Sequence, residues 1–162
     1  TTALGHAHFF AILASLGLNN SSVRAMSVDQ KQRNIHFTNS LVLRTVLTVF
    51  FFSFMLLSIT WSNYNSNVIY LLIIFGFVRF GNEFMNGYYA FYDAKEKFLT
   101  STIFTSSYSS LFLLTTIIII FLQGNYFHFA LSRLAIILIL FLVIVLYTKR
   151  YFSFSYSKRN IR

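Results

Sequence analysis

Four polar residues interrupt the second long apolar segment of the chain, and their types and spacing make them the strongest candidates for chemistry. They are Arg79, Asn82, Glu83 and Asn86, here called the polar cluster. Spacings of three, four and seven residues put all of them on one face of a helix, where Arg79 and Glu83 can neutralise each other. A charge at membrane depth costs at least about 2.5–3.5 kcal/mol unless it is paired. The cluster predicts either a proton, quinone or ion site at a subunit interface, or a structural ion pair near the helix end.

The histidines offer no metal site and no haem site. His6 and His8 lie near the start of the sequence, His36 precedes the first long apolar segment, and His128 lies at the boundary of the last. Neither His36 nor His128 lies deep enough to hold a haem inside a helical bundle. The sequence has no Cys, no glycine-rich phosphate loop and no hydrolase motif. We therefore predict no catalytic residue, no metal site and no self-contained enzyme.

The composition excludes a water-soluble domain. Of 162 residues, 56% are hydrophobic and only 10% are charged, with 21 Phe, 10 Tyr and no Pro. Mean hydropathy is +0.64, far above that of soluble proteins. The net charge of +9 does not indicate nucleic acid, because the basic residues lie outside or at the ends of the apolar runs. We interpret them as membrane topology signals.

Four apolar segments have about the 20 residues that a helix needs to cross a hydrocarbon core of roughly 30 Å. They cover approximately residues 41–61, 67–92, 102–122 and 127–147. In lipid every backbone polar group must be satisfied within its own segment, so helices are expected despite the Ile and Val runs. Arg44, one turn into the first segment, is expected to extend its side chain to the interface. The predicted fold is an all-α integral membrane protein with a short amphipathic segment before about four transmembrane helices.

The basic residues predict the orientation of these helices. The loops at 62–66 and 123–126 carry no charge, whereas the remaining loop and both ends of the chain are basic. The basic residues concerned are Arg24, Lys31, Arg33, Arg44, Lys95, Lys97, Lys149, Arg150, Lys158, Arg159 and Arg162. By the positive-inside rule, we predict four crossings with both termini on the positive side, the cytoplasm or the mitochondrial matrix.

Three regions follow from this pattern. Residues 1–40 contain one mostly apolar stretch of only ten residues, 9–18, which is too short to span, and they are expected to lie in the interface or against a partner as an N-terminal arm. Residues 41–148 form the transmembrane domain, and residues 149–162 form a basic tail. The sequence begins with Thr rather than Met, as expected either for a processed product or for part of a longer chain.

Two stretches resemble the cytochrome b membrane-anchor subunit of succinate dehydrogenase, respiratory complex II. NEFMNGYYAFYDAKEK at 82–97 looks like the end of that family's second helix, where a haem-binding His precedes a glycine-containing pair and a surface Asp. RNIHFTNS at 33–40 resembles the stretch that opens its first helix and forms part of its quinone site. The family's haem His falls on Glu83, its quinone-site Ser on Arg33, and its Arg after the His on Phe37. A fourth segment also exceeds the family's three helices.

The resemblance implies a haem-free anchor or accessory subunit of a respiratory-chain complex. It implies ubiquinone close to His36, Glu83, Tyr92 and Asp93, although Asp93 comes one residue early for the family pattern. It further implies bound phospholipid, neighbouring membrane and matrix subunits, and a place in the mitochondrial inner membrane with both termini in the matrix. No nucleic-acid partner is expected.

Three other hypotheses stay open. Arg79, followed by Gly87 eight residues later, is similar to the essential-arginine helix of ATP synthase subunit a. A small homo-oligomeric transporter or channel could use Arg79 and Glu83 to line its path. In a purely structural scaffold, the polar cluster would only hold helices together.

Overall fold

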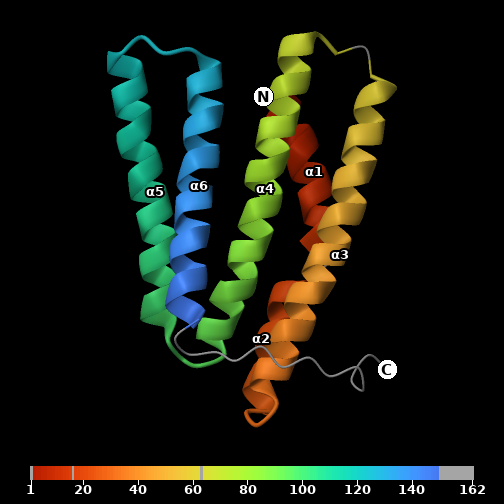
Figure 1. The fold of residues 1–162 in the computed structure, drawn as a ribbon, viewed down its shortest axis with the longest axis vertical. Coiled ribbons are helices and arrows are strands. Elements are labelled where there is room, and N and C mark those ends of the chain that lie inside the picture. Colours follow the sequence, from red (N-terminus) through yellow and green to blue (C-terminus); the bar gives the residue numbers. More distant parts are fainter. Residues whose placement is uncertain (1, 16, 63, 150–162) are drawn as a thin grey trace.

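The computed structural model describes residues 2–15, 17–62 and 64–149, and within them all regular structure is helical. The six helices are α1 (Thr2–Ser15), α2 (Leu18–Val28), α3 (Arg33–Thr60), α4 (Ser66–Asp93), α5 (Phe98–Phe121) and α6 (Tyr126–Lys149). Figure 1 shows them as one bundle in which α4 lies between the α5–α6 pair and α3. The predicted all-α class is confirmed.

Helices α3 to α6 are long and apolar enough to cross a membrane. Two have 28 residues and two have 24, so they measure about 36–42 Å at a rise of about 1.5 Å per residue. This confirms the four predicted segments and the integral membrane class. The first segment is longer than expected, because α3 begins at Arg33 and adds two polar turns below the apolar run.

The first forty residues differ from the expected interfacial arm. Helices α1 and α2 together run antiparallel to α3 along its whole length. At one end Ala3 of α1 packs with Ile59 of α3, and at the other end the Arg33 Nε donates to the Met26 carbonyl oxygen at 3.0 Å. The two helices are separated at Gly17, whose φ of 72° lies in the left-handed region. The segment is therefore a broken helix packed into the bundle.

Small side chains explain why α1 packs so closely. Its buried residues are the alanines Ala3, Ala7, Ala11 and Ala14. They repeat every three or four residues and form one smooth stripe that faces α3 and α4, against Met55 and Phe80. Small residues let the backbones of neighbouring helices approach each other closely in a membrane protein. The packing energy gained in this way is not reflected in the hydropathy of the sequence.

This broken helix also changes the predicted topology. Helix α1 begins at the end of the bundle that carries the uncharged 61–65 and 122–125 loops, whereas α6 ends beside the 94–97 loop at the other end (Figure 1). The first and last helices thus start and finish at opposite ends, where the sequence predicted a shared end. The basic end is still as predicted for the described loops, since Lys31, Lys95 and Lys97 lie in the 29–32 and 94–97 connections. Of the predicted basic tail, 150–162 lie outside the described residues.

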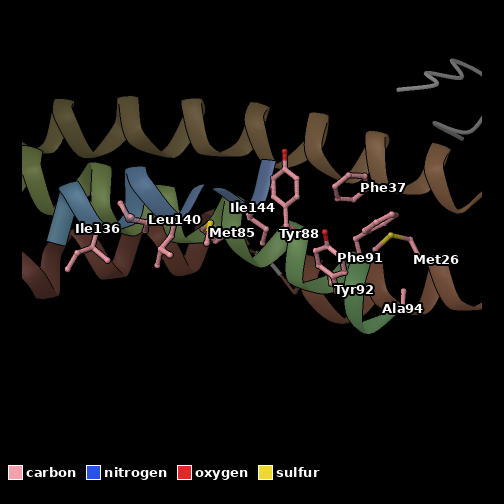
Figure 2. Packing of buried hydrophobic residues seen from close by; sticks show 12 residues of the cluster. Met26, Phe37, Met85, Tyr88, Phe91, Tyr92, Ala94, Ile136, Leu140 and Ile144 are labelled. Carbon is pink, nitrogen blue, oxygen red and sulfur yellow. The ribbon is translucent and has the colours of Figure 1, made fainter. Parts of the chain in front are cut away.

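The largest apolar core lies toward the basic end, where α2, α3, α4 and α6 meet. Figure 2 shows Phe37 of α3 against Tyr88 and Phe91 of α4, with Met26 of α2 beside them. By contrast, none of the described residues of α5 is buried. Helix α5 packs against α4 and α6, and its contacts with α1 and α2 are marginal at most. A gap therefore runs between α5 and the α1–α2 pair.

Candidate functional site

An ion pair between α3 and α4 lies at the centre of the polar region. The side chain of Arg44 is only 1% exposed, and its Nη1 lies 3.7 Å from Glu83 Oε2. Nη1 also donates to the Glu83 carbonyl oxygen at 3.1 Å, and Nη2 donates to Asn19 Oδ1 of α2 at 2.5 Å. The expectation that Arg44 reaches the interface is wrong, because its guanidinium finds a carboxylate and two further acceptors inside the bundle. Arg44 therefore links α2, α3 and α4.

Gly87 gives Arg44 the room to make these contacts. A Cβ atom at position 87 would lie 3.2 Å from the Cδ and Nε atoms of Arg44 and 3.1 Å from Leu41. The arginine side chain thus crosses the bare backbone of α4 one turn beyond Glu83. Gly87 belongs to the Asn86–Gly87 pair on which the family resemblance partly rests, and in this structure its missing side chain makes room for Arg44.

Arg79 does not form the predicted ion pair with Glu83. Among the described residues, no carboxylate lies within 4 Å of its guanidinium, and its buried Nε has no hydrogen-bond partner. Arg79 still attracts the Glu83 carboxylate electrostatically, although Arg44 attracts it more strongly. It lies 14 residues before the end of α4, about 21 Å along the helix and so near mid-membrane. Two guanidinium groups therefore lie near one carboxylate at this depth, and only Arg44 is paired with it.

The polar cluster lines a cavity between α1, α4 and α5. This deep cavity has a volume of about 370 Å³, and all four cluster residues contribute to its wall. His8 of α1 and Thr105 of α5 line the cavity on its other sides. The sequence prediction placed the four residues on one helix face, and in the structure all four line this cavity.

A second polar cavity adjoins the first toward the basic end. This outer cavity has a volume of about 450 Å³ and shares Asn86, Tyr89 and Thr105 with the deep cavity. Its other polar residues include Asn19, Asp93 and Ser101. The Ser101 hydroxyl donates to Asp93 Oδ1 at 2.6 Å. Together the two cavities form a polar groove that follows α4 from mid-membrane to its end.

The four residues expected near a quinone are not brought together. His36 lies 3.9 Å from Asp29 and lines a separate cavity between α2 and α3. Tyr92 is buried in the apolar core, where its hydroxyl meets Thr148 Oγ1 of α6 at 2.8 Å. Glu83 lies in the deep cavity and Asp93 in the outer one. Only these last two border the same groove.

Sequence reasoning missed two residues of this site, Arg44 and Asn19. Arg44 had no clear signal, because the apolar run begins at Leu41 and puts Arg44 only one turn inside it, as for an arginine that reaches the interface. Asn19 had none, because its role depends on α2 packing beside α3.

No protein family, curated protein or solved structure matches the chain. The function is therefore inferred from the charges, shape and depth of the groove. These features are a polar groove inside the helical bundle, with two arginines and one glutamate near its deepest point.

Proposed function

We propose that the chain is a membrane transport protein, or the membrane part of one, whose groove binds and conducts an anionic solute. The observation that carries the proposal is Arg79, a guanidinium at mid-membrane with a buried, unpartnered Nε on the wall of a polar cavity. Intramembrane ionisable residues usually face a water-filled cavity and mark a substrate or ion pathway.

The charge balance favours an anion over a cation. At the deep end of the groove, Arg79 on the wall and Arg44 behind it carry two positive charges against the single negative charge of Glu83, which is paired with Arg44. The other carboxylate of the groove, Asp93, lies at its outer end. An unpaired guanidinium at this depth is costly by at least about 2.5–3.5 kcal/mol. An anionic group beside Arg79 would offset that cost, so the deep cavity is expected to attract one.

The lining of the groove provides a route toward the basic end. From Arg79 to Asp93 the wall carries amide and hydroxyl groups, including those of Asn86, Tyr89 and Thr105. These groups can donate hydrogen bonds to an anion that has lost part of its hydration shell. The 29–32 and 94–97 connections, which carry Lys31, Lys95 and Lys97, lie at the outer end of the groove and add positive potential there.

The test is flux through the purified chain in lipid vesicles, with radiolabelled phosphate, chloride and glucose 6-phosphate as probes. Arg79→Gln should reduce anion flux at least tenfold, because it removes the unpaired charge. Arg133→Gln is the matched control, since Arg133 is also intramembrane but stacks over Phe112 of α5, with 4.0 Å between its Cζ and the ring centroid. No flux of any probe above protein-free vesicles, or an equal loss in both variants, would contradict the transport proposal.

A second proposal keeps the respiratory-complex hypothesis, with complex II first. It is supported by the order Glu83, Asn86, Gly87 and Asp93 along α4, since Glu83, Asn86 and Asp93 border one groove that is wide enough for a quinone headgroup. It includes ubiquinone, bound phospholipid and partner subunits in the mitochondrial inner membrane. His36 and Tyr92 have no part in this version, because they lie elsewhere.

Co-purification separates the two proposals. Under the second one, tagged chain extracted in mild detergent should recover succinate dehydrogenase subunits, and Asp93→Asn should slow quinone reduction in that complex. Recovery of the chain without respiratory subunits would leave transport as the only supported function.

A further inference from the structure

A third polar cavity lies at the basic end of the bundle, apart from the groove. It has a volume of about 260 Å³ and sits where α2 ends, α3 begins and the 94–97 connection passes. Its wall contains the side chains of Ser27, Gln30, Arg33, Lys95 and Glu96. We call it the interfacial cavity, because helix ends of this kind lie at headgroup level.

The two cations of this cavity are held in place. The Arg33 Nε donates to the Met26 carbonyl oxygen at 3.0 Å, which leaves the two terminal nitrogens of the guanidinium as further donors. Lys95 Nζ lies 4.2 Å from the centroid of the Phe91 ring. Burial lowers the pKa of Lys95, and the charges of Arg33 and Lys97 lower it further. The cations therefore stay close together although they repel each other.

The start of α3 adds to the positive potential. Arg33 is the first residue of this 28-residue helix, and its N-cap residue, Gln32, makes no side-chain capping hydrogen bond. The first turn contains no acidic residue. Amide N–H groups at a helix N-terminus point outward and favour anions, most of all phosphate groups. Here the Gln32 N–H already donates to Asp29 Oδ1 at 3.1 Å, and the remaining N–H groups of the first turn add to the potential of the two cations.

We propose that the interfacial cavity binds a net-anionic phosphate group through Arg33 and Lys95. Glu96 also lines the cavity, but it is a single exposed carboxylate against two half-buried cations. The phosphate can belong to an anionic phospholipid of the leaflet at this end or to a soluble phosphate, since both present the same oxygens. The site is independent of transport, because it shares no lining residue with the groove.

The test measures binding of dioctanoyl phosphatidylglycerol, dioctanoyl phosphatidylcholine and inorganic phosphate to the purified chain in neutral detergent. Arg33→Gln/Lys95→Gln should weaken phosphatidylglycerol binding by about tenfold or more, because each cation contributes about fivefold. The matched control is Arg24→Gln/Lys31→Gln, which removes two exposed cations from the same end and should change binding less than about twofold.

A second measurement keeps both cations of the binding site and does not depend on the double variants folding. Lysines are labelled with ¹³C-methyl groups, and the Lys95 signal is assigned by its loss in Lys95→Arg. The pKa of Lys95 should rise when the anion binds, because a negative charge stabilises the ammonium form. A rise with phosphatidylglycerol alone assigns the site to lipid, and a rise with inorganic phosphate assigns it to a soluble anion. No rise with either probe, equal losses in both double variants, or equal binding of phosphatidylcholine would overturn the proposal.

Discussion

The two sides of α4 border spaces of opposite chemistry. On one side lies the polar groove, with Arg79, Asn82 and Glu83 on its wall. On the other side, between α3, α4 and α6, lies an apolar groove of about 450 Å³ lined by residues that include Phe77, Phe80 and Phe84. One stretch of α4, residues 77–89, contributes to both walls, because a helix turns successive side chains to different faces.

The difference shows why mean hydropathy alone cannot identify a functional helix. The apolar groove needs nothing beyond acyl chains to fill it, since lipid is the solvent at this depth. The polar groove can be stable only if its charges are paired within the protein, as Arg44 and Glu83 are, or neutralised by something that enters. Function is therefore expected on the polar side of α4.

Breaking the ion pair should have the largest effect on stability. Arg44→Ala leaves Glu83 with only the more distant Arg79 and removes the link to Asn19, so we expect a loss of about 3–5 kcal/mol. Thermal unfolding in detergent measures it. The double variant Arg44→Met/Glu83→Gln should recover part of the loss, because no buried charge is left unpaired. If both variants lose the same stability, the pair matters only for packing.

Two glycines of α4 allow the two sides to be compared directly. Gly87→Ala should cost about 1–3 kcal/mol, because the new Cβ meets Arg44 at 3.2 Å and three polar contacts prevent Arg44 from moving. In Gly81→Ala, on the apolar groove, the new Cβ lies 3.4 Å from Ile137. Alanine also favours helix by about 0.5–1 kcal/mol, so this variant should be neutral or slightly more stable. Equal destabilisation of both would contradict the difference between the two grooves.

The smallest effect on stability is expected from the hydroxyls of α5. Thr105→Val removes a hydroxyl shared by the deep and outer cavities, and Thr115→Val removes one outside both; each hydroxyl donates to a backbone carbonyl of its own helix. Each should change stability by less than about 0.5 kcal/mol, as surface substitutions do. Only Thr105→Val should reduce anion flux, by about two- to tenfold. Equal flux in the two variants would mean that the hydroxyl side of the groove does not contact the solute.

The sequence was sufficient for features that depend on local composition. The four long helices follow from apolar length, and the basic loops gather at one end as the positive-inside rule predicts. The spacing of Arg79, Asn82, Glu83 and Asn86 was also sufficient to place them on one wall, because helical periodicity is a local property.

The remaining features depend on which helices become neighbours. Arg44 lies 39 residues from Glu83, and no spacing rule connects two helices. The alanine stripe of α1 is too weakly apolar to signal a buried helix, although close backbone packing stabilises it. The separation of His36 and Tyr92 from the groove follows from the rotation of α3 and α4 about their own axes, which hydropathy does not report.

Gly17 divides the N-terminal pair into two parts that are anchored differently. Below the glycine, α2 is clamped to α3 by the Ser22–Ser40 and Met26–Arg33 contacts, while above it α1 rests on its alanine stripe. A pivot at this position would let α1 tilt as a rigid rod with α2 stationary. His8 of α1 lines the deep cavity, whereas Asn19 of α2 lines the outer one. Such a tilt would therefore change the volume of the deep cavity and leave the α2 wall of the outer cavity in place.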